Sequence, residues 1–496
     1  MTASARTRTQ PARRFTLVGL TGFAAVGAAG AAFALLLLMV RGQWPPLESL
    51  DHGVAASLNS YVSSREWLLA PLRSVTTLGN TLVLCCIIGA IALALALRGR
   101  SRLAIYLVVT GIGSLIMGPA LKLFVGRLRP VVEDTVALAP GNSFPSGHAL
   151  GSIVCYGAIT LAFLPAVRGR ARTALLAIAA VLVALIGFTR IALGVHFVSD
   201  VIGGWLLGAV WLAVTARAFE TWRVQVGRRP SEPLREGLEP EAATDVRPAP
   251  EDDPAPKAAW WRVSAGLAVA WVLIYGLVLT FGRLVTGSKS DFLGDQTIPR
   301  WLAAHRTPTL DRVSEGASLI GGTPTIIGVA FILVVLTLAV TRLWRPALFL
   351  AVTLVGEVVM FLALVAVVGR PRPGVERLDG QLPTSSYPSG HLAATICLYA
   401  AAALLVTATI RRWWRWLAVA AAILLPLAVA WGRLYRGMHH PSDLAGSIML
   451  AACWLTAAYL LIRPTRPVTP RESIAPAQNT APAETSAPSE KDQMRR

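Results

Sequence analysis

The sequence predicts an all-α integral membrane protein of two tandem six-helix bundles, with about 12 transmembrane helices related as parallel repeats. Three observations predict this fold class. Hydrophobic residues make up 54% of the 496 positions and charged residues only 15%, whereas soluble domains carry about 25% charged residues. Apolar runs long enough to cross a bilayer recur along the chain. The second half of the chain repeats the polar motifs of the first half.

The apolar runs set the expected number of spans. A membrane-spanning helix needs about 20 mostly apolar residues. Runs of this kind include Phe15–Val40, Leu103–Phe124, Ala347–Val368 and Ser442–Ile462. The first of them is longer than the 7–15-residue core of a secretory signal peptide, so we expect it to remain as a span.

Arginine clusters between the spans predict the orientation of the chain. The net charge is +19, but the arginines are dispersed at alternate span ends rather than gathered on one face, which argues against a nucleic-acid partner. The positive-inside rule then places both termini and the central linker in the cytoplasm of a multi-pass cell-membrane protein. The clusters comprise Arg6, Arg8, Arg13 and Arg14; Arg98, Arg100 and Arg102; Arg168, Arg170 and Arg172; Arg217 and Arg223; Arg342 and Arg345; Arg411, Arg412 and Arg415; and Arg463 and Arg466.

An internal repeat relates the two halves. Gly126–Pro130 recurs as Gly369–Pro373, 243 residues further along the chain. The later motifs recur at the same offset, so the two halves align there without a gap. The same offset carries Pro145–His148 onto Pro388–His391, Arg190 onto Arg433, His196 onto His439 and Asp200 onto Asp443. Because an even number of spans returns the chain to the same side, both sets of residues should face one compartment, on the extracytoplasmic side.

Composition divides the chain into five segments. We expect a cytoplasmic tail at 1–14, a first six-span domain at 15–218 and a second at 259–463. Residues 219–258 are rich in proline and mixed charge, which predicts a cytoplasmic linker without a core of its own. Residues 464–496 have the same character and predict a disordered cytoplasmic tail.

Cationic residues of the first copy suit a phosphate group. Lys122, Arg129 and Arg190 fall at span ends on one face, and arginine binds phosphate oxygens through two parallel hydrogen bonds. Ser146 and Gly147 open the fourth span, where free backbone N–H groups and the helix dipole favour an anion. Glycine at that position permits close approach, and the serine hydroxyl can donate a hydrogen bond.

Two histidines and an aspartate supply the chemistry. His196 and Asp200 are four residues apart, so the carboxylate can hold one ring nitrogen and leave the other free to attack phosphorus. His148 would give a proton to the leaving oxygen and later take one from water. This pathway passes through a phosphohistidine. These loops contain no carboxylate cluster, so we expect neither a metal ion nor another cofactor.

These residues resemble the three signature blocks of the type-2 phosphatidic acid phosphatases, the lipid phosphate phosphatases that share a fold with vanadium-dependent haloperoxidases. The resemblance implies that His196 is the nucleophile, that His148 is the general acid and that the cationic residues hold phosphate. In the second copy, Val365 replaces the lysine of the first block, and we expect that copy to be active with a weaker phosphate cradle. Its matching residues are Arg372, Ser389, Gly390, His391, Arg433, His439 and Asp443. Arg370 and Arg436 are candidate substitutes for the lysine.

The leading function is therefore hydrolysis of a lipid phosphate or diphosphate, for example polyprenyl diphosphate, phosphatidic acid or phosphatidylglycerophosphate. A transferase that passes the phosphoryl or head group to another acceptor would use the same residues. A transporter of two six-span halves would share the symmetry but would place polar residues at the bilayer midplane. The second copy could also be a binding or regulatory half. Glu357 lies mid-span where the first copy has Ser114, and both packing and functional roles are open. The oligomeric state is open too.

Overall fold

The structure is a computed structural model that describes residues 10–132, 141–247, 257–287, 291–379, 385–409, 412–413 and 415–465. All regular secondary structure in the described residues is helical, which confirms the predicted fold class. The predictions for residues 1–9 and for the C-terminal tail from residue 466 onward lie outside the described residues.

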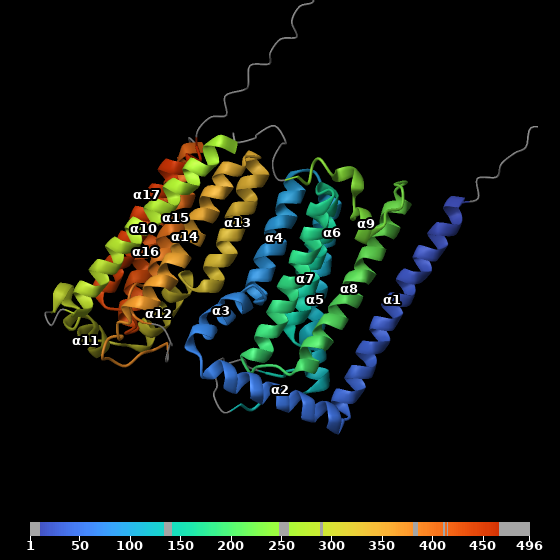
Figure 1. The fold of residues 1–496 in the computed structure, drawn as a ribbon, viewed down its shortest axis with the longest axis horizontal. Coiled ribbons are helices and arrows are strands. Elements are labelled where there is room, and N and C mark those ends of the chain that lie inside the picture. Colours follow the sequence, from blue (N-terminus) through green and yellow to red (C-terminus); the bar gives the residue numbers. More distant parts are fainter. Residues whose placement is uncertain are drawn as a thin grey trace, which may run out of the picture.

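The first half supplies six helices that run the length of the bundle and two that do not. The long helices are α1 (Gln10–Arg41), α4 (Thr81–Leu97), α5 (Ser101–Val125), α6 (Gly147–Phe163), α7 (Arg170–Ala192) and α8 (Val198–Gln225). Between α1 and α4, helix α2 (Pro45–Ser63) lies across one end of this bundle, and α3 (Glu66–Thr77) leads back toward α4 (Figure 1). The polar positions of α2 explain this course, because its buried residues include Asp51 and Asn59.

The second half repeats this arrangement. Its long helices are α10 (Lys257–Gly287), α13 (Thr323–Thr341), α14 (Trp344–Val368), α15 (Gly390–Thr409), α16 (Arg415–Tyr435) and α17 (Pro441–Ile462), with the shorter α11 (Thr297–Ala304) and α12 (Pro308–Ile320) at the same end as α2 (Figure 1). Eleven helices of the described chain are long and apolar enough to cross a membrane. The pair α3 and α4, bent by 43°, brings the number to as many as 12, in agreement with the sequence-based expectation.

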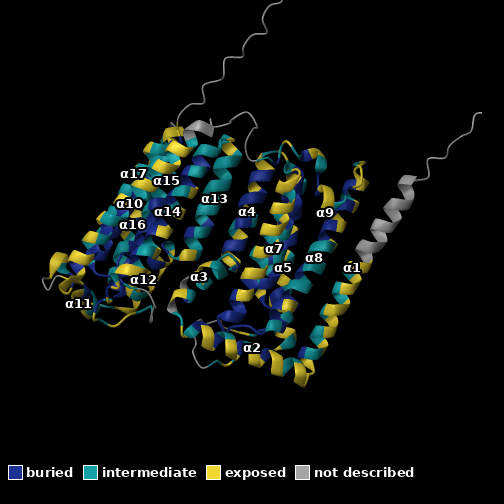
Figure 2. Cartoon of the chain, viewed as in Figure 1, coloured by how far each residue is buried: buried dark blue, intermediate teal, exposed yellow. Residues whose placement is uncertain are grey.

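The two bundles pack against each other through α4 and α13 (Figure 1). Ile327, Phe331 and Val335 of α13 contact the apolar core of the first bundle, which includes Val83 and Ile87 of α4. Exposed residues recur along the long helices of both bundles (Figure 2). Many of these exposed residues are large and apolar; Leu123 of α5, for example, is 82% exposed. A bilayer is the solvent that suits such a surface, because lipid tails are as apolar as these side chains.

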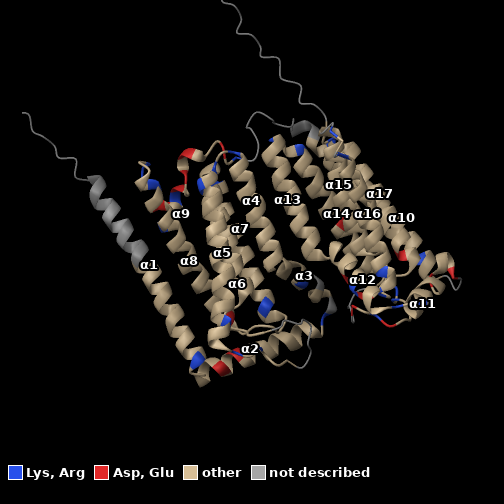
Figure 3. Cartoon of the chain, turned by 180° about the vertical axis from the view of Figure 1, so that it is seen from behind, with Lys and Arg blue, Asp and Glu red and all other residues tan. Residues whose placement is uncertain are grey.

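Part of the central linker is ordered at the end of the first bundle opposite α2. Leu238, Ala242 and Val246 are buried in the core of that bundle. Arg223 of α8 donates to the carbonyl of Leu238 over 2.8 Å and holds the linker there. The part of the linker that the structure describes, up to residue 247, thus packs on the first domain. Charged side chains concentrate at the two ends of the molecule and are sparse between them (Figure 3).

Candidate active site

Two glycine turns, one after α5 and one after α7, help to bring the predicted residues of the first copy together at the α2 end of the bundle. Helix α5 ends at Gly126, which has φ of +69°, and the chain then turns into the segment that carries Arg127 and Arg129. Gly194, with φ of +70°, ends the turn after α7 and directs the chain toward His196. Glycine suits both positions because other L-residues rarely adopt positive φ. We call Lys122, Arg129, Ser146, Gly147, His148, Arg190, His196 and Asp200 the first site.

His196 is held from both sides of its ring. Its Nδ1 lies 3.3 Å from Oδ2 of Asp200, and its Nε2 lies 3.2 Å from Nη1 of Arg129. An arginine can only donate, so Nε2 must carry a lone pair and Nδ1 the proton. Burial lowers the pKa of His196 to about 4, against the raising effect of its hydrogen bond to Asp200. The ring is therefore neutral at pH 7, with its free lone pair on Nε2.

Cationic side chains surround this ring. Arg129 also donates to the carbonyl of Val195 over 2.7 Å, which fixes its guanidinium beside His196. Arg190 is buried at the end of α7 and donates to the Thr76 hydroxyl over 2.8 Å. The charges of Lys122, Arg129 and Arg190 all act on His148 at the start of α6, so these four side chains occupy one region. The predicted cluster is therefore present as a spatial unit.

The N-terminus of α6 is open toward this region. The hydroxyl of Ser146 is buried and has no hydrogen-bond partner among the described residues. A Cβ atom added at Gly147 would meet nothing within 4 Å. An anion could therefore approach the free backbone N–H groups of α6, and Ser146 could donate to it.

Arg127 is a member of this cluster whose role the sequence motifs did not predict. Its guanidinium donates to Asp200 over 3.0 Å, to Asp51 over 2.9 Å and to the Ser199 hydroxyl over 2.6 Å. Asp51 lies on α2 and also accepts from the backbone N–H of Ser199 at 3.0 Å. Arg127 thus ties α2, the loop after α5 and the start of α8 into one buried network that holds Asp200 in place.

Only some residues of this network recur at the constant offset of the sequence repeat. Arg127 and Arg370 obey the offset of 243, and Arg370 likewise pairs with Asp443 and Asp295. Asp51 and Asp295, however, are 244 residues apart, so an ungapped comparison places Gly294 opposite Asp51. The recurrence of an Arg-Asp-Asp network in both halves becomes visible only in the structure.

The second copy assembles the same positions with different contacts. Nη1 of Arg372 donates to the carbonyl of Met438 over 2.6 Å, as Arg129 does to Val195. His439, whose pKa burial lowers to about 4, differs from His196. Its Nδ1 lies 2.7 Å from the carbonyl oxygen of Ser386 and 3.7 Å from Oδ2 of Asp443. We call Arg372, Ser389, Gly390, His391, Arg433, His439 and Asp443 the second site.

The two arginines considered as substitutes for the missing lysine have carboxylate partners. Arg370 bridges Asp443 and Asp295 and so corresponds to Arg127 rather than to Lys122. Arg436 pairs with Asp379. Neither cation is therefore free to take the place of Lys122 beside Val365.

Two further polar residues of the second half lie away from these contacts. His440 is buried at the start of α17, and its Nδ1 lies 2.9 Å from the carbonyl oxygen of Asp295. Glu357 of α14 is buried, and neither of its carboxylate oxygens has a hydrogen-bond partner among the described residues.

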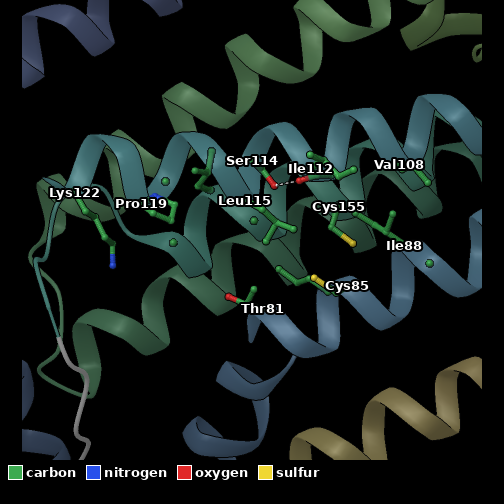
Figure 4. Close-up of a pocket in the computed structure, with 17 residues that line it drawn as sticks. Thr81, Cys85, Ile88, Val108, Ile112, Ser114, Leu115, Pro119, Lys122 and Cys155 are labelled. Carbon is green, nitrogen blue, oxygen red and sulfur yellow. Dashed lines mark hydrogen bonds between the residues drawn. The ribbon is translucent and has the colours of Figure 1, made fainter. Parts of the chain in front are cut away.

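An apolar cavity of about 370 Å³ begins at the first site and runs between α4, α5 and α6. Lys122 lies at one end of this cavity and Val108 at the other (Figure 4). Its lining includes three glycines, Gly111, Gly118 and Gly151, which contribute no side chain to the cavity wall. Val108, Ile112 and Leu115 line it and are 40%, 49% and 42% exposed, so the cavity borders the outer apolar surface.

The described residues contain no group of three or more His, Cys, Asp or Glu side chains arranged to hold a metal ion. The carboxylate of the first site, Asp200, instead has arginine, histidine and backbone N–H partners.

Comparison with known proteins gives matches to both halves. The family model of the PAP2 superfamily matches residues 102–223 and again residues 345–467. An undecaprenyl-diphosphatase of Sulfolobus acidocaldarius is 32% identical over 135 residues, which are 26% of this chain and 61% of that protein. Phosphatidylglycerophosphatase B of Bacillus subtilis is 27% identical over 165 residues, which are 33% of this chain and 79% of that protein. The match thus spans less than two thirds of the length of the first relative.

A solved structure matches in addition. It is described as the first transmembrane PAP2 type phosphatidylglycerolphosphate phosphatase from Bacillus subtilis, is 24% identical and covers 38% of this chain and 96% of its own, with a TM-score of 0.35. The two segments matched by the family model each contain both histidines and the aspartate of one site. The chain therefore carries two tandem domains of the PAP2 superfamily and belongs to that family.

Proposed function

We propose that this protein hydrolyses a lipid-borne phosphate or diphosphate at its first site, through a phosphohistidine on His196 and without a metal ion. The observation that carries the proposal is the fixed tautomer of His196, whose Nε2 lone pair faces Arg129 beside Lys122 and Arg190. The names of the two curated relatives, an undecaprenyl-diphosphatase and a phosphatidylglycerophosphatase, support lipid phosphates as the substrate class.

The reaction would proceed in two steps. The phosphate oxygens are bound by Arg129, Arg190 and Lys122. On binding, Arg129 donates its hydrogen bond to the phosphate instead of to Nε2 of His196, which leaves the Nε2 lone pair free. The negative charge of the bound phosphate favours the imidazolium form of His148. Nε2 of His196 then attacks phosphorus, the bond to the leaving oxygen breaks and the His148 imidazolium donates its proton to that oxygen. In the second step water attacks the phosphohistidine while His148 takes a proton from it, which releases phosphate and restores both histidines.

Asp200 contributes orientation to this reaction. Its Oδ2 accepts from the Phe197 backbone N–H over 2.9 Å, and Arg127 holds its other oxygen. The carboxylate therefore keeps the ring proton on Nδ1 and stabilises the positive ring that forms during attack.

The cavity next to Lys122 would accommodate the lipid tail. Because the cavity borders the outer apolar surface, a lipid could enter sideways while its phosphate stays at the end of the helices. The site lies at the end of the bundle opposite the arginine-rich linker end, so the positive-inside rule favours an extracytoplasmic site and cytoplasmic termini.

Phosphate release by the purified full-length protein tests this function. The panel should contain a polyprenyl diphosphate, phosphatidic acid and phosphatidylglycerophosphate, each with and without a metal chelator. We expect chelator-resistant release of inorganic phosphate from at least one of them. No release from any of these lipids would contradict hydrolysis, and chelator-sensitive release would contradict the metal-free mechanism.

The pH dependence follows from the environment of His196. Burial holds the pKa of its ring at about 4, below the usual 6.5, so the neutral nucleophile persists down to that pH. We expect kcat/KM, corrected for ionisation of the substrate phosphate, to fall with decreasing pH only near pH 4. A fall centred near 6.5 would show that the nucleophile is an ordinary exposed imidazole.

Filling the cavity should select against long lipid tails. We expect Gly118→Phe to lower kcat/KM for a long-chain lipid phosphate at least about tenfold relative to a short, water-soluble phosphate ester, because its ring takes the space of the tail. An added Cβ would lie 3.4 Å from Leu150, which is ordinary contact, so the backbone can stay in place. Gly276→Phe on α10, where a Cβ meets nothing within 4 Å, is the matched control. Equal loss for both substrates would contradict the tail cavity.

A further inference from the structure

Asp379 lies where the second half should bind a phosphate group. We propose that this carboxylate is an internal substitute for the anion and that it closes the second site to lipid phosphates, so that the first site alone turns over. This inference rests on the function proposed for the first site. It assigns Asp379 as the residue that distinguishes the two halves.

The contacts of Asp379 are those expected of a bound phosphate. One carboxylate oxygen accepts from Nη1 of Arg433, and the other accepts from Nε of Arg436. An anion with two oxygens on two guanidinium groups reproduces the way arginine clusters hold phosphate. Asp379 also acts electrostatically on Arg372, so it lies among the cations of the second site.

Among the residues that the structure describes, the first site contains no such arrangement. Arg190, the counterpart of Arg433, donates to Thr76 and has no carboxylate partner in the part of the chain that the structure describes. The position of Arg436 is Leu193 in the first half. The second half therefore has an additional arginine, Arg436, and both this arginine and Arg433 pair with Asp379.

The N-terminus of α15, which corresponds to the anion-binding end of α6, is obstructed as well. A Cβ atom added at Gly390 would lie 2.8 Å from the ring of Phe361, whereas the corresponding space beside Gly147 is open. Phe361 replaces Gly118, and Val365 replaces Lys122. The phosphate-facing end of the second half has thus lost a cation and gained an aromatic ring.

The tail cavity is filled in the second half. Gly111, Gly151 and Cys155 line the cavity of the first half, and their counterparts are Leu354, Ala394 and Leu398. These three residues pack together with Ile326 in one apolar cluster. A long lipid tail would find side chains where the first half has open space.

The imidazole of the second site also lacks the arrangement found in the first. Nδ1 of His439 is nearer to the Ser386 carbonyl, at 2.7 Å, than to Asp443, at 3.7 Å. Arg370 holds Asp443 as Arg127 holds Asp200, so the two sites differ in the contacts of the imidazole and not in those of the carboxylate. Four separate features therefore agree with a closed second site. Asp379 bridges two arginines, a valine replaces the lysine of the first site, apolar side chains take the place of the tail cavity, and Nδ1 of the histidine lies nearest to a backbone carbonyl oxygen rather than to the aspartate.

Equilibrium binding of inorganic phosphate to the full-length protein tests the role of Asp379. At concentrations that saturate the first site, we expect one phosphate per chain for the wild type and two for Asp379→Asn. An internal anion competes at an effective concentration of roughly millimolar or higher, so the second phosphate should bind at least about tenfold more tightly in the variant. Adding Arg433→Gln to Asp379→Asn should return the number to one.

Asp245→Asn is the matched control, because Asp245 pairs with Arg100 at the linker end of the first bundle. It should bind one phosphate. Two phosphates of similar affinity in the wild type, or only one in Asp379→Asn, would overturn the inference. Asp379→Ala serves as a second variant, with the same outcomes, if Asp379→Asn does not fold. No phosphate in the wild type but one in Asp379→Asn would support the role of Asp379 and contradict the function proposed for the first site.

Discussion

Replacing His196 by alanine should lower the rate of phosphate release by about four orders of magnitude, because the change removes the nucleophile and leaves no substitute. Asp200 cannot take over, since Arg127 and the Phe197 backbone N–H hold its oxygens. If Asp379 closes the second site, the loss should be nearly complete in the full-length chain. Initial rates of phosphate release under saturating lipid measure this effect.

The exposed histidine His305 provides the control for this substitution. It contacts Trp301 and lies outside both sites, so His305→Ala should retain wild-type turnover. Residual activity near half of the wild-type rate in His196→Ala would show that the second site also hydrolyses substrate. Unchanged activity would place the nucleophile elsewhere.

Replacing Arg127 by alanine should lower the free energy of unfolding by about 3–5 kcal/mol, the cost of leaving buried charges without a partner. Asp51 and Asp200 are both fully buried and both accept from this guanidinium. The protein that remains folded should also turn over more slowly, because Asp200 loses the contact that fixes its position. Denaturant titration in detergent measures the stability, and kcat measures the effect on the reaction.

Arg312→Ala on α12 is the matched control for this prediction. Arg312 is exposed and donates to the carbonyl of Pro308 in the same helix, so its removal should change the stability by about 0.5 kcal/mol or less. If Arg127→Ala were no more destabilising than Arg312→Ala, the buried network would not hold α2 and α8 together. A stable but slow variant would show that Arg127 acts mainly by orienting Asp200.

The sequence predicted the fold and the polar motifs because both depend on local patterns. Apolar runs of bilayer length define the spans, and motifs at constant spacing define the two sets of site residues. Residues that contact the site from α2 and α3 follow different spacings. Thr76 and Ser318, which accept from Arg190 and Arg433, are 242 residues apart rather than 243.

The asymmetry of the two halves was only partly accessible to sequence comparison. The replacement of Lys122 by Val365 is visible in the sequence. The contact between Asp379 and Arg433 is not, because a carboxylate in a loop 54 residues away carries no periodic signal. The packing of Phe361 against Gly390 also depends on the approach of α14 to α15, which no local pattern encodes.

Rapid acid-free quenching of the full-length protein during turnover of a ³²P-labelled lipid phosphate tests the central claim most directly. We predict a covalent phosphate on His196 that is labile in acid and stable in base, present in the wild type and absent in His196→Ala. Label that persists in His196→Ala, or release of phosphate without labelled protein at any time during turnover, would contradict the phosphohistidine mechanism.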